Sequence, residues 1–438
     1  METRLADAPN RTRGLVRAGT STGRSGYPRG VLAPAGQTEP GAVSTIQRAE
    51  VVVAVDGGAD TAEAVRTAQR IGAQLGSAGP SRPAALLLLS EGAPPPMPPE
   101  AATPGGPPLL AWSHPGQSAL EATLRAAERF GAAAAALVVS RDDHREVEAH
   151  RLIAPVVDGG FDLVCPWYAS HRFDAVIHTA LVTPTLRALF GRRLRRPLGS
   201  ELALSRRAVS HLLGDAWLAD PTRAGDPMWL LTAVLSRDLR VAQVHLGAPP
   251  PRREAPALDL AAALASVVGR LFHEVRLHAP TWQRVKGAHA VPSFGDGAGV
   301  AALAADARPP PIAPMVAAFQ LGYRELGHLW GTLLPPHTLL ALKHLSRQPE
   351  ERFAIDDTLW ARIVFDFAVG YHLATLDRAQ LLRAMVPLYL GWAAGFVREV
   401  CDLAPAAVDE RTERLGRAFE VAKPYLISRW RWPDRFNP

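Results

Sequence analysis

The sequence predicts an α/β protein in which a mainly parallel sheet is followed by a mostly helical region. Up to about residue 250, apolar runs of strand length alternate with helical patterns, and continuous apolar runs are typical of strands that are buried on both faces. After the proline-rich stretch "LGAPPPRREAP" the chain shows helical patterns only. Buried strands that alternate with helices form parallel sheets, which bind ligands at the carboxyl ends of their strands.

The first half reads as a regular series of strands and helices. "VVVAVDGG" predicts a buried strand and a turn, with a helix from about Thr61, and "ALLLLSEG" predicts the second strand. "LLAWS", a helix of about 14 residues that ends at Gly131, and "AAAALVVSRDD" follow; a further helix leads to the strand "FDLVCPWY". One edge of the sheet should therefore carry Asp56, Ser90, Glu91 and the "SRDD" turn at 140–143.

The second half predicts helices at 257–277, 313–330, 336–346, 357–374, 378–400 and 407–427, and an exposed loop in "SFGDGAGVAALAADARPPPIAP" at 293–314. Residues 1–48 are rich in Arg, Gly, Pro, Ser and Thr without apolar periodicity, which is typical of disorder. We therefore expect a disordered tail at 1–48, an α/β domain at 49–250 and a helical domain at 251–438.

Composition excludes several classes of protein. The net charge is +6, but seven arginines against three acidic residues stand in the first 48 positions, and the nearly balanced remainder argues against nucleic-acid binding. Two cysteines, Cys165 and Cys401, are too few for a disulfide framework and favour the cytoplasm. "AMVPLYLGWAAGFV" lies between Arg383 and Arg398 and is too short to span a membrane, so it predicts a buried helix.

The turn "VDGGAD" at 55–60 has two interpretations. A pair of glycines before a helix presents free N–H groups to an anion such as a phosphate. The same residues also suit a tight turn between a strand and a helix that binds nothing. The motif is neither GxGxxG nor a Walker loop, so the sequence leaves both interpretations open.

The stretch "RFDAVIHTALVTPTLRALFGRRLRRPLGSELALSRRAVSHLL" at 172–213 combines an amphipathic helix, an arginine cluster and a Gly-Ser turn. A turn that presents the carboxylate of Glu201 beside a sheet suits hydroxyl binding or base chemistry. The cluster of Arg192, Arg193, Arg195 and Arg196 predicts either a solvated helix end or contact with a diphosphate or an anionic surface.

This stretch, together with "GGFDLVCPWYASH" before it and "RVAQVHLGAP" behind it, resembles bacterial nucleotide-sugar glycosyltransferases of the GT-A fold, related to family 2 and to mannosylglycerate synthase. C-terminal stretches such as "FQLGYRELGHLW" and "AFEVAKPYLISRW" are similar to the helical domain of that group. The resemblance covers roughly residues 49–430. It implies a Rossmann-like sheet that binds a nucleoside diphosphate sugar, with an Asp-x-Asp turn after the fourth strand that holds Mg²⁺ or Mn²⁺.

The chain departs from this pattern at the turn itself. Ser140, Arg141 and Asp142 occupy the Asp-x-Asp place, so a hydroxyl replaces the first carboxylate and the cation would lose a ligand. Asp142 and Asp143 are a poor substitute, because neighbouring residues at a strand end point to opposite sides. We therefore expect no metal cofactor.

Three further departures concern the same diphosphate region. Pro115–Ser118 ("PGQS") replaces a Pro-Gly-Lys-Gly turn and loses a lysine. In "AGDPMW", Pro227 stands where the group tends to have an aspartate, and Asp226 comes one place early. "LGAPPPRRE" lacks the histidine that would complete the metal shell, and His245, on an apolar strand, predicts a core residue.

Two mechanisms follow from the resemblance and these departures. In the first, Arg141, with Arg192 or Arg193, replaces the cation in a metal-independent transfer of a hexose to a small hydroxylated or carboxylated acceptor. In the second, the chain is a non-catalytic subunit that binds protein partners through its tail or its helical domain. In an active enzyme the expected positions are Asp56 and Glu91 by the nucleoside, Asp142 near the diphosphate and Glu201 near the acceptor hydroxyl.

Overall fold

The computed structural model describes residues 48–58, 60–77, 83–92, 106–140, 148–169, 171–174, 176–199, 201–214, 225–247, 259–295 and 309–433. All of these fall within one compact unit, Thr38–Pro438. The predicted tail at 1–48 lies outside the described residues, apart from its last residue, as does most of the "SRDD" turn.

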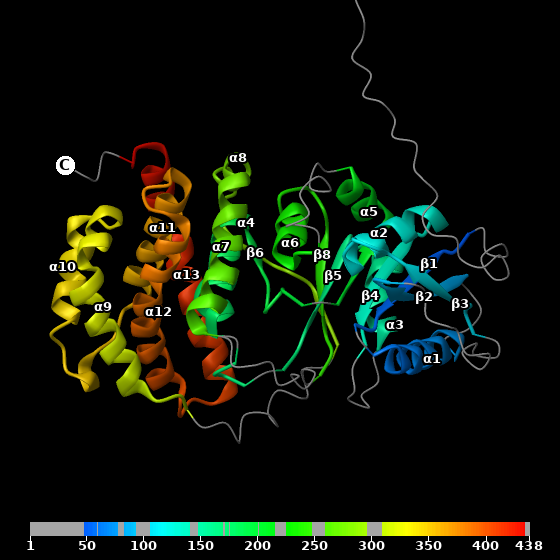
Figure 1. The fold of residues 1–438 in the computed structure, drawn as a ribbon, viewed down its shortest axis with the longest axis horizontal. Coiled ribbons are helices and arrows are strands. Elements are labelled where there is room, and N and C mark those ends of the chain that lie inside the picture. The colour runs from blue at the N-terminus through cyan, green and yellow to red at the C-terminus, as the bar shows by residue number, and fades with distance from the viewer. Residues whose placement is uncertain are drawn as a thin grey trace, which may run out of the picture. The chain divides into compact units, whose positions relative to one another are not determined.

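The first half forms the predicted α/β arrangement (Figure 1). Its strands and helices are β1 (Val51–Asp56), α1 (Thr61–Ser77), β2 (Ala84–Ser90), β3 (Leu109–Ser113), α2 (Ala119–Phe130), β4 (Ala134–Val139), α3 (Ala149–Val157), β5 (Leu163–Trp167), η3 (His178–Val182), α4 (Thr183–Phe190), β6 (Arg192–Arg193), β7 (Leu202–Ser205), α5 (Arg206–Leu213), α6 (Pro227–Leu235) and β8 (Val241–His245). The predicted fold class, a mainly parallel sheet followed by a mostly helical region, is confirmed.

The sheet has the order β10-β8-β5-β7-β4-β1-β2-β3. Every neighbouring pair is parallel except those of β7, which runs antiparallel to both β4 and β5. Its central strands are buried on both faces and separate two apolar clusters, as their continuous Val, Ala and Leu runs predict. Because β7 is antiparallel, its first residue lies at the edge where β4 and β5 end.

The turn after β1 is explained by packing against α1. A Cβ atom added to Gly57 would lie 2.5 Å from the Cβ of Ala64, so only glycine lets the strand end approach the helix this closely. Gly58 has φ +53°, a conformation that side chains rarely adopt. The Asp60 side chain accepts a hydrogen bond from the Glu63 N–H and caps the helix. These contacts agree with the interpretation of "VDGGAD" as a tight turn.

The second half contains α7 (Leu260–Leu277), α8 (Ala279–Trp282), α9 (Ile312–Leu333), α10 (Pro336–Leu345), η6 (Glu350–Arg352), α11 (Asp357–Leu373), α12 (Arg378–Val400) and α13 (Pro405–Arg431). The six predicted helices are all present, and α12 contains the apolar stretch that predicts a buried helix. Among the described residues, no helix combines the length and the apolar character needed to cross a membrane.

Two short strands correct the expectation that only helices follow residue 250. β9 (His289–Ala290) pairs with β6, and β10 (Ser293–Phe294) joins the main sheet beside β8. The predicted exposed loop at 293–314 therefore begins as a strand, although both residues of β10 are exposed as expected for the edge of a sheet. Two-residue strands are too short to produce an alternating pattern that could be read from the sequence.

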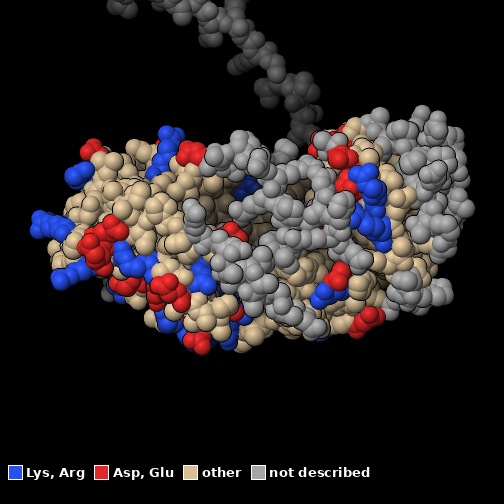
Figure 2. Space-filling view, turned by 90° about the horizontal axis from the view of Figure 1, so that it is seen from below, with Lys and Arg blue, Asp and Glu red and all other residues tan. Residues whose placement is uncertain are grey.

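Contacts join the helical region to the α/β region. The Trp360 indole N–H of α11 donates to the Ala180 carbonyl oxygen over 2.9 Å. The Arg172 guanidinium donates to the carbonyl oxygens of Val400 and Cys401, where α12 ends. On the face seen in Figure 2, acidic and basic side chains are interspersed over the helical region, and the described residues of this face form no basic stripe of the kind that binds nucleic acid.

Candidate functional site

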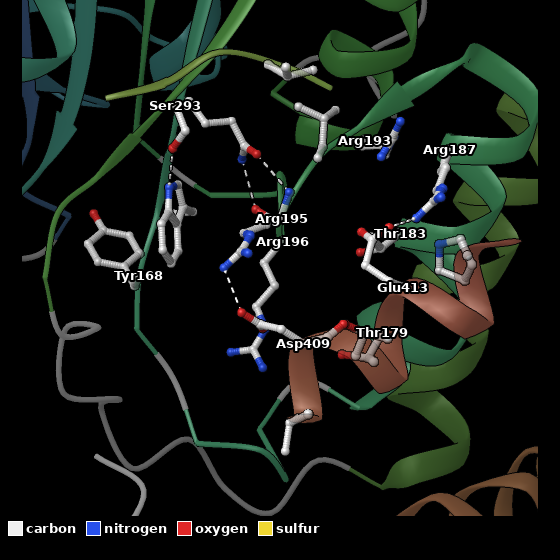
Figure 3. A pocket seen from close by; sticks show the side chains of 18 of the residues that line it. Tyr168, Thr179, Thr183, Arg187, Arg193, Arg195, Arg196, Ser293, Asp409 and Glu413 are labelled. Atoms are coloured by element: carbon white, nitrogen blue, oxygen red, sulfur yellow. Dashed lines mark hydrogen bonds and ion pairs between the residues drawn. The ribbon is translucent and has the colours of Figure 1, made fainter. Parts of the chain in front are cut away.

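A cavity of about 350 Å³ lies where the end of β5 and the middle of β8 meet α4, β10 and the first turns of α13. Charged groups dominate its polar lining (Figure 3). Five arginines and two carboxylates take part: Arg172, Arg187, Arg193, Arg195, Arg196, Asp409 and Glu413. Such an excess of guanidinium groups in a concave site favours an anionic ligand.

The segment that carries three of these arginines is fixed by hydrogen bonds to the sheet. The Arg195 N–H donates to Gln243 Oε1 over 2.7 Å, and Gln243 Nε2 donates to the Arg195 carbonyl oxygen over 2.8 Å. Gln243 belongs to β8 and is 3% exposed, so the segment is held by a buried side chain. The Arg193 guanidinium also donates to the Ala288 carbonyl oxygen. The backbone of this segment is therefore held to the sheet at Arg195 through both its N–H and its carbonyl group.

The two carboxylates of the cavity come from α13 and pair with arginines of the α/β region. Asp409 lies 3.2 Å from Arg195, and both side chains are more than half exposed, so water screens this pair and it contributes little to stability. Glu413 lies 2.8 Å from Arg187, which is buried and also pairs with Glu420. Arg187 is therefore held by two carboxylates of α13. The pair of Arg195 and Asp409 is exposed, so an anionic ligand can replace Asp409 as the partner of Arg195.

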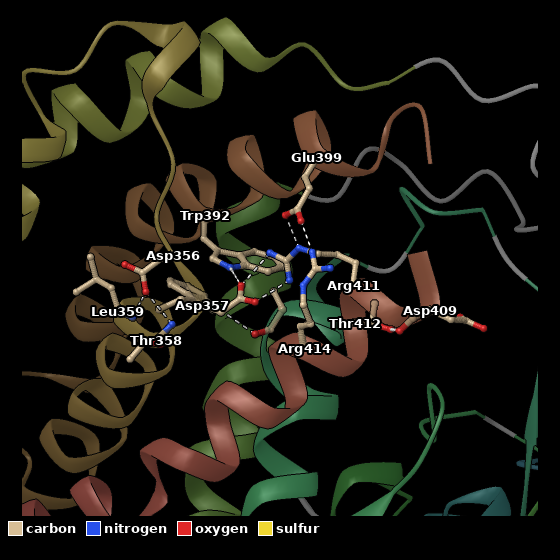
Figure 4. Close-up of polar contacts among 12 residues, drawn as sticks. Asp356, Asp357, Thr358, Leu359, Trp392, Glu399, Asp409, Arg411, Thr412 and Arg414 are labelled. Atoms are coloured by element: carbon tan, nitrogen blue, oxygen red, sulfur yellow. Dashed lines mark hydrogen bonds and ion pairs between the residues drawn. The ribbon is translucent and has the colours of Figure 1, made fainter. Parts of the chain in front are cut away.

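The first turns of α13 are themselves anchored by Arg411 (Figure 4). Its guanidinium donates two hydrogen bonds, of 2.8 and 2.9 Å, to the two carboxylate oxygens of Asp357 in α11, and a third to Glu399 in α12. The Trp392 indole N–H donates to Asp357 as well. A bidentate arginine–carboxylate pair fixes orientation as well as distance. This anchor therefore sets the position from which Asp409 and Glu413 enter the cavity.

A buried carboxylate lies next to the cavity. Glu201 directly precedes β7, is 2% exposed, and accepts a hydrogen bond from the Tyr168 hydroxyl. Tyr168 follows β5 and lines the cavity, whereas Glu201 is not among the lining residues. A carboxylate held by a hydroxyl donor in this way suits proton transfer.

The residues predicted to bind the donor lie further along the same edge of the sheet. Asp56 ends β1 and pairs in register with Leu89 of β2 and Val139 of β4, which places it beside Glu91 and Ser140. The Asp56 side chain accepts a hydrogen bond from the Gly58 N–H over 3.0 Å, and Glu91 is exposed. Arg141 and Asp142 lie outside the described residues.

The structure places only part of the arginine cluster at the cavity. The cluster follows α4 rather than ending it, and Arg192 and Arg193 form β6. Arg193, Arg195 and Arg196 line the cavity, but Arg192 does not. The cluster is therefore not simply a solvated helix end, and Arg192, predicted with Arg193 as a binding residue, is not brought into the cavity.

Two of the other departures from the glycosyltransferase pattern contain helix caps, and the third, "PPPRRE" at 249–254, lies outside the described residues. The Ser118 hydroxyl accepts from the Glu121 N–H and caps α2. The Asp226 carboxylate accepts from the Met228 N–H, caps α6, and lies 3.3 Å from Arg270. His245 is buried, as the sequence predicts, and its ring lies 4.1 Å from that of Trp167.

The metal that the resemblance implies can be tested only against the described donors. Ser140 offers a neutral hydroxyl at the end of β4, and within the described part of the chain no three His, Cys, Asp or Glu residues gather in a metal-binding group. The described donors at the end of β4 therefore do not form a site for a divalent cation. The expectation that the chain uses no metal stays a prediction.

Sequence patterns did not single out Tyr168, Asp409 or Glu413. Tyr168 could have been noticed, because it is the first polar group after the strand "FDLVCPW" and such positions line ligand sites in parallel sheets. Asp409 and Glu413 come from a helix more than 200 residues away from the arginine segment, and nothing local to "VDERTERLG" indicates that it meets a sheet.

The fold and the site together define an α/β protein with an arginine-lined cavity at the carboxyl edge of its sheet. No family model and no curated protein matches this chain. Among solved structures it is similar to glucosyl-3-phosphoglycerate synthase from Mycobacterium tuberculosis in complex with Mn²⁺, UDP-glucose and phosphoglyceric acid. The identity is 20%, the match covers 51% of this chain and 79% of that one, and the TM-score is 0.35. A second match, described as a mycobacterial protein, has 18% identity, 52% and 74% coverage and a TM-score of 0.35. At these values neither likeness assigns an activity to this chain.

Proposed function

We propose that the chain is a glycosyltransferase-like protein of the GT-A type, which transfers a hexose from a nucleoside diphosphate sugar to a small hydroxylated acceptor that carries an anionic group. The observation that supports this most directly is the arginine-lined cavity beside the buried carboxylate of Glu201, at the edge of the sheet where ligands of parallel α/β proteins bind.

The cavity suits the anionic end of an acceptor. Arg193, Arg195 and Arg196 come from a segment whose backbone is held to β8 at Arg195, so little backbone freedom is lost when they bind. Guanidinium groups bind phosphate and carboxylate through paired hydrogen bonds. A volume of about 350 Å³ lies at the small end of ligand sites, which favours an acceptor of a few carbon atoms over a polymer.

The donor belongs at the neighbouring part of the same edge. In this proposal Asp56 and Glu91 bind the nucleoside, because they follow the adjacent strands β1 and β2. We expect Arg141 and Asp142 near the diphosphate, with Arg141 supplying the positive charge that a metal supplies in the glycosyltransferases that the sequence resembles. The α/β domain at 49–250 holds the donor, and the helical domain at 251–438 completes the acceptor cavity through α13.

A thermal-shift experiment with a panel of UDP- and GDP-hexoses, each with and without Mg²⁺ or Mn²⁺, tests the donor half of the proposal. A ligand that binds only the native state raises its stability by mass action, by about 2.7 kcal/mol at one hundred times its dissociation constant. We expect stabilisation by one class of sugar nucleotide without added metal. Stabilisation that requires metal would contradict the role of Arg141. No response to any donor would favour the second mechanism, a non-catalytic subunit with protein partners.

A further inference from the structure

The order of the strands places two side chains between the proposed donor site and the cavity. β2, β1 and β4, which carry the donor edge, are followed across the sheet by β7, β5 and β8. Glu201 directly precedes β7, whose first residue, Leu202, pairs with Leu137 of β4. Tyr168 stands after β5, whose last residue, Trp167, pairs with His245 of β8. These two residues therefore stand between the proposed donor edge and the cavity along the edge of the sheet.

The contact between them has a direction. The Tyr168 hydroxyl donates its proton to Glu201 Oε2, so the phenol oxygen can accept a proton from elsewhere while it gives up its own. Figure 3 shows the Tyr168 ring on the cavity wall with its hydroxyl pointing away from Arg187 and Glu413. An acceptor that spans the cavity from the arginines toward the donor edge would bring its hydroxyl to the Tyr168 side. Glu201 is buried and does not line the cavity, whereas Tyr168, its hydrogen-bond donor, does.

We propose that Tyr168 is a catalytic residue of the transfer, and that it relays the proton of the acceptor hydroxyl to Glu201. This inference rests on the proposed function and assigns the proton acceptor within it. It also changes the role that the sequence suggests for Glu201, which receives the proton through Tyr168 instead of contacting the acceptor.

The step balances with the two substrates alone. The acceptor oxygen forms a bond to the anomeric carbon of the sugar as its proton moves to the Tyr168 oxygen. The Tyr168 proton moves to Glu201 Oε2. The bond between the anomeric carbon and the diphosphate oxygen breaks, and its electron pair leaves with the nucleoside diphosphate. Glu201 then returns the proton to water through Tyr168 after the products leave.

The test measures single-turnover transfer from UDP-glucose and GDP-mannose to glycerate and glycerol 3-phosphate by the wild type, Tyr168→Phe, Glu201→Gln and the double variant. We expect each single variant to slow transfer by about 10² to 10⁴-fold, the usual contribution of a positioned acid or base. The double variant should be no slower than the slower single variant, because residues that act as one unit are not additive.

Binding controls separate this role from a structural one. Titration with inorganic phosphate should give the same affinity for the wild type and Tyr168→Phe, which shows that the variant folds and keeps the arginine site. Tyr323→Phe, at a half-buried tyrosine of α9 beside Trp330, should transfer at the wild-type rate. In mixtures of light and heavy water, the wild-type transfer rate plotted against the heavy-water fraction should be curved, because two protons move in one step.

Three results would overturn the relay. Transfer by Tyr168→Phe within twofold of the wild type would overturn the relay alone, and so would a linear dependence of the wild-type rate on the heavy-water fraction, which indicates one moving proton. If the wild type binds phosphate but transfers from neither donor to either acceptor, the proposed function is overturned together with the relay.

Discussion

At the scale of single residues, two neighbouring arginines differ in what they contact. Arg193 lines the cavity and Arg192, in the same short strand, does not. A guanidinium that loses an anionic ligand loses a charge-assisted hydrogen bond, which contributes about 1.5 to 3 kcal/mol. The pair therefore offers a comparison in which the change in net charge is identical and only the position differs.

We expect Arg193→Gln to weaken the binding of inorganic phosphate by at least about tenfold, and Arg192→Gln to change it by less than about twofold. Isothermal titration at fixed ionic strength measures both. Equal losses in the two variants would mean that phosphate responds to the net charge of the surface and not to the cavity.

Single residues also show the limit of what the sequence predicts. The burial of His245 follows from its place within an apolar strand, and the glycine at 131 ends a helix where expected. These features depend on neighbours in the chain. The hydrogen bond from Tyr168 to Glu201 joins residues 33 positions apart across two strands, and no local pattern encodes it.

At the scale of elements, α13 connects the two halves of the chain and shapes the cavity. Arg411 holds it to α11 and α12, and its side chain is 7% exposed, whereas Arg414 in the same helix pairs with the same Glu399 but is 54% exposed. Removal of Arg411 leaves Asp357 without its bidentate partner, in a site that is 18% exposed.

We expect Arg411→Leu to lower the free energy of unfolding by about 2 to 4 kcal/mol, somewhat less than for a fully buried pair because Glu399 is partly hydrated. Arg414→Leu should cost no more than about 1 kcal/mol. Urea unfolding followed by tryptophan fluorescence measures both values. Similar small losses in both variants would contradict the role of Arg411 as the anchor of α13.

A second contact of α13 makes the stability of the protein depend on pH. Lys423 is buried and donates to the carbonyl oxygens of Leu189 and Val285. Burial lowers the pKa of Lys423 from 10.5 to about 8, and Glu420 opposes this only in part. Between pH 8 and pH 10.5, Lys423 is protonated in the unfolded chain but mostly neutral in the native state. The unfolded state then binds more protons, so Lys423 makes the free energy of unfolding rise with pH.

The wild type should therefore gain stability between pH 8 and 10 relative to Lys423→Met. Guanidinium unfolding at several pH values in this range measures the difference, and Lys343→Met, at an exposed lysine of α10, should follow the wild type. Parallel pH profiles for the wild type and Lys423→Met would show that Lys423 does not titrate in this window.

Helices were predicted from the sequence more fully than short strands. The predicted helices 336–346 and 378–400 match α10 and α12 within one residue, because apolar periodicity over three or more turns is a strong local signal. β7 went unpredicted because its four residues, "LALS", lie between a polar turn and a helix. The antiparallel insertion of this strand is what brings Glu201 to the edge.

At the scale of the whole molecule, the division into an α/β domain and a helical domain stays a prediction. The described residues belong to one compact unit, and α4 contacts α13 through Arg187, which pairs with Glu413 and Glu420. Gly416 makes this approach possible, since an added Cβ atom would lie 2.6 Å from an Arg187 nitrogen. The cavity depends on this contact, because its lining comes from both halves of the chain.

The central claim is that the cavity holds the acceptor for sugar transfer. Mass spectrometry of a reaction that contains the full chain, UDP-glucose or GDP-mannose, and glycerate or glycerol 3-phosphate tests it most directly. We predict a product one hexosyl unit heavier than the acceptor, formed equally well with EDTA present and reduced at least about tenfold by Arg193→Gln. A folded wild-type chain that binds phosphate and forms no such product, or a product whose yield Arg193→Gln leaves unchanged, would contradict the account.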